Sequence, residues 1–170
     1  AATQRPQPVP AALVDALRAH EAGAAMIDVQ MGARSELASE AQAIRTRVFV
    51  EEQRVPVEIE RDAADAGAVH ALARNRLGLA VGTGRLLAAD GPGHPARIGR
   101  MAVARGLRGA NIGRAVLEAL MAAAARRGEA EVMLHAQVSA LGFYRRAGFV
   151  PHGERFEEAG IGHQEMRRNP

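Results

Sequence analysis

The chain has 170 residues, 48% of them hydrophobic, and it carries 22 basic and 19 acidic side chains for a net charge of +3. This length and apolar content fit one folded domain and exclude a mainly disordered protein. The sequence contains no cysteine and no lysine, which excludes disulfides, thiol nucleophiles, cysteine-ligated zinc, a phosphate-loop lysine and a lysine Schiff base.

The sequence gives no signal for a nucleic-acid, membrane or metal partner. The arginines are spread along the chain among the acidic residues, and only five aromatic residues are present for base stacking. No apolar run approaches the roughly eighteen residues of a membrane helix, and residues 1–10 lack the basic and apolar segments of a signal peptide. The six histidines include no close pair at metal-ligand spacing. We therefore expect a soluble, cytoplasmic protein without a metal cofactor.

The first predicted elements follow a tail, residues 1–10, that is rich in Pro and Gln. A short helix is predicted over 11–23, where apolar residues have helical spacing and a glycine ends the segment. Apolar and polar residues alternate over 26–31, which predicts a strand. Ser35, with an acidic residue in the first turn after it, is expected to cap a helix that runs to about Gln53.

The later elements are expected in the order strand, strand, strand, helix, strand, helix, strand, strand, over 69–74, 79–88, 97–103, 111–127, 131–136, 139–147, 150–156 and 164–168. The first two strands form a hairpin through 75–78, and 90–93 is a loop. Strands 97–103 and 131–136 flank one helix, so they should run parallel through a right-handed crossover. This order predicts a mixed sheet with helices on its faces.

A pair of glycines, Gly82 and Gly84, lies inside the second strand of that hairpin. A dinucleotide-binding loop needs a helix directly after its glycines, and none follows here. The pair therefore predicts a bulge or a close approach of two backbones.

The segment from Arg100 to Arg114 runs from a strand through a turn of small residues into the most regular predicted helix of the chain. Free backbone N–H groups at a helix start, together with the helix dipole, bind anions. Glycine lets a phosphate approach the backbone closely, and Arg108 and Arg114 add positive charge. The segment predicts a phosphate-binding loop, with an ordinary surface turn before a helix as the alternative.

Residues 108–113 resemble the signature of the GNAT superfamily of acetyl-CoA-dependent N-acetyltransferases, which reads Gln or Arg, two residues, Gly, one residue, then Gly or Ala. Arg108, Ile112 and Gly113 fit this signature, and Asn111 stands where the first glycine is usual. Asn adopts unusual backbone angles more readily than most residues. The resemblance implies that the loop binds the diphosphate of CoA and that the preceding strand lines its pantetheine arm.

The stretch from Gln137 to Phe149 resembles the closing motif of the same superfamily, a polar residue, a tyrosine seven residues later, and then Gly-Phe. Gln137 takes the place of the usual Asn, Tyr144 is the only tyrosine of the chain, and Gly148 fits a helix C-cap. Together the two motifs imply a set of cofactor-binding residues, Met101, Ala102, Val103, Arg108, Gly109, Ala110, Asn111, Ile112, Gly113, Arg114 and Gln137.

The resemblance also implies a chemical role for Tyr144. A thiolate departs when CoA gives up its acyl group, and a phenol with a pKa of about 10 can protonate it or donate a hydrogen bond as charge develops. A buried tyrosine with a satisfied hydroxyl is the structural alternative. Because the chain has no cysteine, an acyl-cysteine intermediate is excluded and direct transfer is expected.

The attacking amine must be neutral, so a side chain or a water must accept its proton. His135 is the first candidate, since it lies near the end of the strand before the tyrosine helix, although a lone strand histidine is often structural. His163 is the second candidate. Acidic side chains near the acceptor entrance would attract a cationic amine, unless they are simply solvated. The substrate-side residues expected from the resemblance are Glu52, Gln53, Glu157, Glu158 and His163.

Segments 45–65 and 157–166 resemble one uncharacterised bacterial branch of the superfamily. We therefore expect a tail and short helix over 1–24, and a GNAT domain over 25–170 with a mixed, mostly antiparallel sheet of about seven strands, helices on both faces and a parallel strand pair that splays at the acetyl-CoA site. The expected activity is acetyl-CoA-dependent transfer of acetyl to a primary amine of a small molecule or peptide. A non-catalytic acyl-CoA-binding module and an acyl transferase that makes a signalling lactone stay open as alternatives, as does a homodimer.

Overall fold

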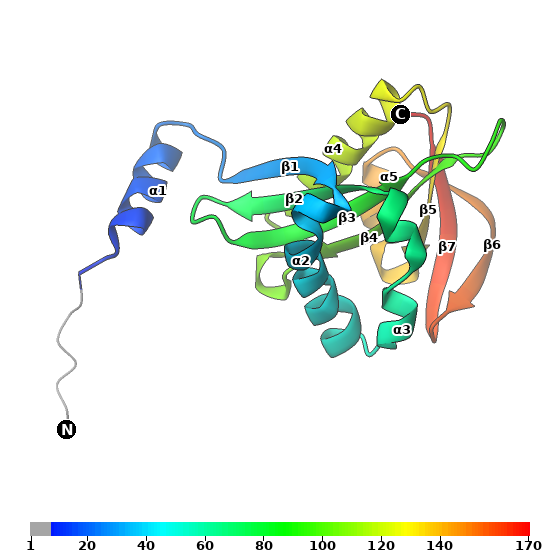
Figure 1. The fold of residues 1–170 in the computed structure, drawn as a ribbon, viewed down its shortest axis with the longest axis horizontal. Coiled ribbons are helices and arrows are strands. Elements are labelled where there is room, and N and C mark those ends of the chain that lie inside the picture. The colour runs from blue at the N-terminus through cyan, green and yellow to red at the C-terminus, as the bar shows by residue number, and fades with distance from the viewer. Residues whose placement is uncertain (1–7) are drawn as a thin grey trace.

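The computed structural model describes residues 8–170 (Figure 1). The α-helices and strands of this part are α1 Ala11–Glu21, β1 Ile27–Ala33, α2 Arg34–Arg45, α3 Val57–Glu60, β2 Val69–Asn75, β3 Ala80–Leu87, β4 Ala96–Val103, α4 Ile112–Arg126, β5 Val132–Gln137, α5 Leu141–Arg146, β6 Val150–Glu158 and β7 Ile161–Arg168. Helix α1 lies apart from the sheet (Figure 1). Within residues 8–170, each helix is too short or too polar to cross a membrane.

The strands form one seven-stranded sheet in the order β1-β2-β3-β4-β5-β7-β6. Every neighbouring pair is antiparallel except β4 and β5, which run parallel on either side of the α4 crossover. The expected mixed, mostly antiparallel sheet with one parallel pair is confirmed. Strand β6 at one edge and β1 at the other leave the central strands β3, β4 and β5 as the core of the sheet (Figure 1).

Helices cover both faces of the sheet. Successive side chains of β2 point to opposite faces, so each face of this strand packs against a different helix. Leu72 packs in one cluster with α2 residues such as Leu37 and Ile44. Its neighbours Ala71 and Ala73 belong to the other cluster, which contains the buried face of α4 together with Tyr144 and other residues of α5. Two hydrophobic layers therefore enclose the sheet, as the order of elements predicted.

The glycines of β3 permit the close packing of α4. A Cβ atom at Gly82 would lie 2.7 Å from a side-chain carbon of Ile112, and one at Gly84 would lie 2.6 Å from the Met101 sulfur and 2.8 Å from a Leu120 carbon. The register of β3 on β4 also shifts between Thr83 and Arg85. The bulge is confirmed, whereas the close contacts at the two glycines are with side chains of α4 and β4 rather than with a second backbone.

Strands β4 and β5 pair at only two positions, Ala96 with Val132 and Arg97 with Met133. Beyond them β4 carries an irregularity at Arg100, whose φ of 53° lies in the left-handed region that non-glycine residues rarely adopt. The remaining residues of the two strands, up to Val103 and Gln137, have no partner in each other. The parallel pair therefore opens toward its C-terminal ends.

The helix expected over 35–53 differs from the prediction in two ways. It begins at Arg34, with Ala33 rather than Ser35 in the cap position, and the side chain of Ser35 lies outside the described residues. Its α-helical part ends at Arg45 and continues as a π-helical turn over Thr46–Glu52, closed by a hydrogen bond from the Gln53 amide to the Val48 carbonyl. A π turn widens the helix by one residue per turn and is frequent at functional sites.

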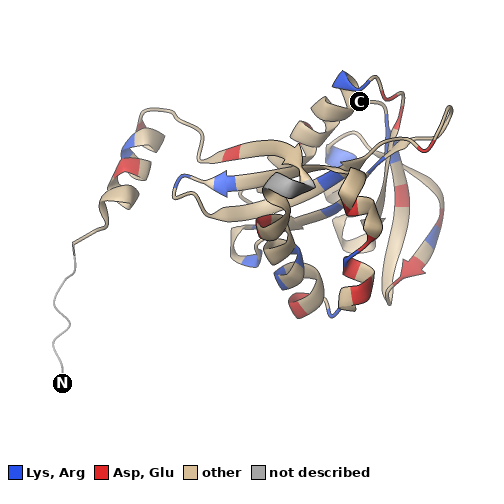
Figure 2. Cartoon of the chain, viewed as in Figure 1, with Lys and Arg blue, Asp and Glu red and all other residues tan. Residues whose placement is uncertain are grey.

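No element was predicted from the sequence between 53 and 69, where the structure has α3 and a 3₁₀ turn over Ala63–Gly67. Three arginines and three carboxylates fix this segment: Arg45, Arg85 and Arg100 with Glu60, Asp62 and Asp65. Elsewhere, charged residues of both signs are spread over sheet and helices in the view of Figure 2.

The centre of this buried cluster is Asp65, which accepts hydrogen bonds from Arg45 at 2.9 and 3.0 Å and from Arg85 at 2.5 Å. Arg45 also pairs with Glu60, whose side chain is fully buried. Hydrogen bonds from Arg85 lower the pKa of Asp62 from 3.8 to about 2. Because this pKa is lower in the folded state, the stabilisation is complete above about pH 4 and is lost as the pH falls toward 2.

We expect Asp65→Ala to lower the free energy of unfolding by about 3 kcal/mol, because the buried guanidinium groups of Arg45 and Arg85 each lose one of their two carboxylate partners. Urea denaturation followed by circular dichroism measures the change. Asp15→Ala, which removes an exposed partner of Arg18 on α1, is the matched control and should leave the unfolding midpoint close to wild type. An equal midpoint for both variants would show that the cluster does not hold the segment.

Candidate functional site

A groove of about 1150 Å³ runs along the start of α4 and continues beside α5. The turn before α4 and the C-terminal half of β4 form one wall, and α5 forms the other. All the residues that the sequence assigned to cofactor binding line this groove except Ala110. The groove lies at the opening between β4 and β5, so the parting of the two strands gives access to it.

The turn at the head of α4 presents backbone donors to the groove. Asn111 is the N-cap residue and has φ 58° and ψ 8°, a left-handed conformation that Asn tolerates and that glycine adopts freely. Within residues 8–170, no backbone carbonyl accepts a hydrogen bond from the amides of residues 111–114. These free amides, at the positive end of a 15-residue helix, make an anion site.

The two arginines of the turn already have partners. Arg108 forms a bidentate ion pair with Glu52 at 2.6 and 2.8 Å and donates from Nε to the Val103 carbonyl at 3.2 Å. These hydrogen bonds from Arg108 lower the pKa of the Glu52 carboxyl below its usual value. Arg114 pairs with Glu118 one turn along α4 at 2.7 Å. The backbone, rather than a free guanidinium, therefore presents the unpaired donors at this end of the groove.

A smaller cavity of about 170 Å³ opens on the other side of the strand gap. Its walls are β4 and β5 at the gap, the π turn with α3, and the β6–β7 hairpin. Five residues line both this cavity and the groove, and they form the boundary between the two: Gln53, Met101, Gln137, Ala140 and Tyr144. A molecule in the groove and another in the cavity would meet at these residues.

Tyr144 lies on this boundary with 8% of its surface exposed. Its ring packs edge-on against Phe143 and Phe149, with centroid separations of 4.9 and 6.0 Å. Burial raises the pKa of its hydroxyl well above the usual value, so the phenol stays protonated at neutral pH. Burial alone raises this pKa, and among the described residues the hydroxyl has no hydrogen-bond partner.

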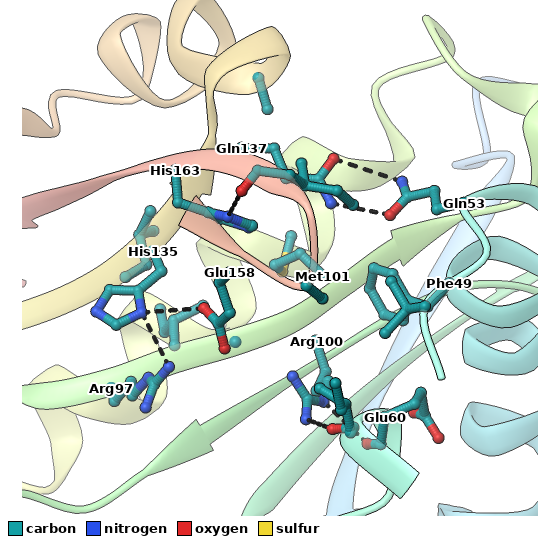
Figure 3. Close-up of a pocket in the computed structure, with 18 of the residues that line it drawn as sticks. Phe49, Gln53, Glu60, Arg97, Arg100, Met101, His135, Gln137, Glu158 and His163 are labelled. Carbon is teal, nitrogen blue, oxygen red and sulfur yellow. Dashed lines mark hydrogen bonds and ion pairs between the residues drawn. The ribbon is translucent and has the colours of Figure 1, made fainter. Parts of the chain in front are cut away.

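Two amide side chains close the gap between the walls. Gln137 at the end of β5 donates to Gln53 at 2.9 Å, and Gln53 donates back at 3.4 Å (Figure 3). The residues are 84 positions apart in the chain, so this contact belongs to the tertiary structure alone. It ties the end of the π turn to the strand that precedes α5.

His135 lines the cavity between groups of opposite charge (Figure 3). Its Nδ1 atom lies 3.2 Å from the Arg97 guanidinium and 3.5 Å from the Glu158 carboxylate, and its Nε2 atom lies 4.0 Å from Glu165. Burial lowers the pKa of His135, and Arg97 lowers it further against the opposite effect of the two glutamates. The imidazole is therefore mostly neutral at pH 7.

His163 also lines the cavity and is 9% exposed. Its Nδ1 atom lies 2.7 Å from the Ile161 carbonyl oxygen. Because a carbonyl only accepts hydrogen bonds, Nδ1 carries the proton and Nε2 keeps a lone pair in the neutral ring. His163 pairs directly across β7 and β5 with Gln137, a residue of the boundary with the groove.

Of the other residues that the sequence assigned to the substrate side, two line the cavity and two do not. Gln53 and Glu158 line the cavity, whereas Glu52 and Glu157 line neither hollow. Glu52 is held by Arg108, and Glu157 lies on the exposed edge strand β6. No site role was predicted from the sequence for Phe49, Ile59, Arg97 or Ile161, which also line the cavity. Arg97 on β4 and Ile161 on β7 gave no signal beyond that of an ordinary strand, and Phe49 and Ile59 lie in the π turn and in α3, which were not predicted.

No group of three or more potential metal-ligating side chains occurs within the part of the chain that the structure describes. The charged residues of the cavity are instead arginines, glutamates and two histidines.

Known proteins share both the sequence pattern and the architecture. A family model described as an acetyltransferase (GNAT) domain matches residues 33–170. YjcF of Bacillus subtilis, which bears the name of an uncharacterized N-acetyltransferase, is 35% identical over 127 residues, which are 74% of this chain and 88% of YjcF.

Two solved structures have the same arrangement of elements. Escherichia coli ElaA superposes with a TM-score of 0.75 at 31% identity, covering 85% of this chain and 100% of ElaA. An acyl-CoA N-acyltransferase from Pseudomonas aeruginosa superposes with a TM-score of 0.74 at 30% identity, covering 84% of this chain and 99% of that protein.

Proposed function

The chain belongs to the GNAT acetyltransferase family, and we infer that it is an acetyl-CoA-dependent N-acetyltransferase that acts on a primary amine of a small molecule or peptide. The family supports acyl transfer in general. One observation carries the finer proposal: a groove with free helix-start amides and a separate small cavity meet at a buried tyrosine whose hydroxyl has no protein partner. We place the catalytic domain at 25–170, since β1 already pairs with β2 along its whole length.

The residues of the groove fit coenzyme A. The free amides of 111–114 would hold its diphosphate, and Gly109 and Gly113 leave room for the phosphates to approach the backbone. The opened half of β4, Met101 to Val103, has strand N–H and C=O groups that β5 does not use, and these would bind the amide groups of the pantetheine arm. This orientation directs the thioester toward Tyr144.

Acetyl-CoA would supply the acetyl group as a thioester, and CoA would leave as a thiolate when the C–S bond breaks. Tyr144 is protonated at neutral pH and would donate its proton, or a hydrogen bond, to the sulfur as negative charge develops there. The amine approaches from the cavity side of the same boundary. With no cysteine in the chain, the acetyl group passes directly to the amine.

His163 and His135 are the two candidate acceptors for the proton of the amine, and we rank His163 first. Its Nε2 lone pair is unused, and its cross-strand neighbour Gln137 lies on the boundary where transfer would occur. Nδ1 of His135 is instead close to Arg97 and Glu158, and His135 lies two residues before Gln137 on β5.

Tyr144→Phe should lower kcat by about 100-fold or more, because the variant loses the proton donor but keeps the ring packing. The dissociation constant of CoA, measured by calorimetry, should stay within about threefold of wild type because the diphosphate site is untouched. A variant that loses CoA binding as much as turnover would identify a structural tyrosine. CoA binding by the wild type without thiol release for any amine would favour the non-catalytic module.

Asn111→Val should weaken CoA binding by about tenfold or more, since a β-branched residue resists the left-handed conformation that orients the amides of 112–114. Asn111→Gly is the matched control, because glycine adopts this conformation without strain. Its CoA affinity should stay within about threefold of wild type. Equal affinity for all three proteins would mean that the turn does not hold the diphosphate.

His163→Gln should reduce kcat/KM by about 100-fold, as the loss of a general base predicts. His135→Gln should stay within about threefold of wild type, because its ring is engaged at the other end of the cavity. Thiol-release assays of both variants measure the two values. The opposite pattern would restore His135 to first place.

A further inference from the structure

The charges that line the cavity are neutralised unequally. Glu60 is buried against Arg45, and Arg100 donates to Asp62 and to two main-chain carbonyls of α3. Arg97 and Glu158 remain. Among the described residues, neither forms an ion pair with an arginine or carboxylate side chain.

Arg97 and Glu158 both lie close to the same atom, Nδ1 of His135. The guanidinium is 3.2 Å and the carboxylate 3.5 Å from Nδ1 of His135 (Figure 3). A neutral imidazole can accept from Arg97 or donate to Glu158 through this nitrogen, but it cannot do both at once. One end of the cavity therefore presents a positive and a negative group that still lack full partners.

We propose that the acceptor is a free α-amino acid with a second amine at the end of its side chain, such as lysine or a shorter homologue. This inference rests on the proposed function. The α-carboxylate pairs with Arg97 and the α-ammonium with Glu158, so the two unneutralised groups recognise the two halves of a zwitterion. The side-chain amine then extends to the boundary at Tyr144, where it receives the acetyl group.

The length of the cavity fits this arrangement. His135 and Gln137 are two residues apart on β5 and project from the same face, one at the charged end and the other at the boundary with the groove. Two residues of a strand span about 6.6 Å, roughly the reach of a side chain with three or four methylene groups. Phe49, Met101 and Ile161 line the cavity as well and give such a stem an apolar path.

Simpler amines match the cavity less well. A diamine without a carboxylate would leave the half-buried Arg97 cation without a counter-ion. An amino acid whose single amine lies at the end of its chain would leave the Glu158 carboxylate without a counter-ion. Each loss removes a charge-assisted hydrogen bond from a site that is partly shielded from water.

Thiol release from acetyl-CoA with three acceptors of equal chain length tests the proposal: L-lysine, 1,5-diaminopentane and 6-aminohexanoate. Lysine should exceed each analogue in kcat/KM by about 10- to 100-fold. Arg97→Gln should abolish the preference over diaminopentane but keep that over aminohexanoate, and Glu158→Gln should do the reverse. Arg126→Gln, at the exposed end of α4 and outside both hollows, is the control and should behave as wild type.

Equal turnover of the three acceptors by the wild type, or an equal loss for all three in Arg97→Gln and Glu158→Gln, would overturn the proposal while acetyl transfer itself stands. Calorimetry gives a second readout: lysine titrated into the CoA-saturated protein should release or absorb heat, and this signal should disappear in Arg97→Gln. Absence of heat with lysine after a normal CoA titration would also overturn the proposal. Absence of heat with CoA would refute the proposed function instead.

Discussion

Strands β4 and β5 pair through two residues and then separate, and the walls of both hollows depend on that separation. The left-handed residue Arg100 and the shifted register of β3 on β4 turn the second half of β4 away from β5. Side chains from other segments fill part of the opening. Along Met101 to Val103, β4 keeps its pairing with β3 but has no partner in β5.

The wall opposite this opening needs its own support, because the segment from 53 to 67 has only two short helical turns. The cluster of three arginines and three carboxylates supplies that support from α2, β3 and β4. A buried cluster of this kind contributes less to stability than an apolar core would, but its hydrogen bonds accept few alternative geometries. The cluster therefore helps to fix the positions of Phe49, Gln53 and Ile59 relative to β5.

Arginine performs every cationic role in this chain, and burial separates those roles. Arg45 and Arg85 are nearly inaccessible and bind carboxylates of the protein, and Arg45 also donates to the Glu60 carbonyl. Arg108 joins the turn before α4 to Glu52 at the end of the π turn through a bidentate ion pair. Arg97 has no carboxylate partner among the described residues and faces the cavity, so its guanidinium is available to a carboxylate of the acceptor.

The sequence alone determined the order of the strands and of every α-helix except α3, the parallel pair across α4, the tight packing at Gly82 and Gly84, and the turn before α4. All of these depend on local signals: the period of apolar residues, a glycine at a close contact, and small residues before a helix. It also singled out Asn111 and Tyr144, whose positions in short motifs fix their surroundings. The left-handed angle of Asn111 is the reason that an asparagine can replace glycine there.

Only the tertiary structure decided which charges remain available to a ligand. Glu52 and Glu158 are equivalent in the sequence, each acidic and each near the expected acceptor entrance, yet a guanidinium 56 residues away holds Glu52 while Glu158 faces the cavity. The π turn, the Gln53–Gln137 contact and the pairing of His163 with Gln137 are likewise absent from any local pattern. Such contacts join segments that are distant in the chain, and their formation depends on the packing of the whole sheet rather than on the spacing of neighbouring residues.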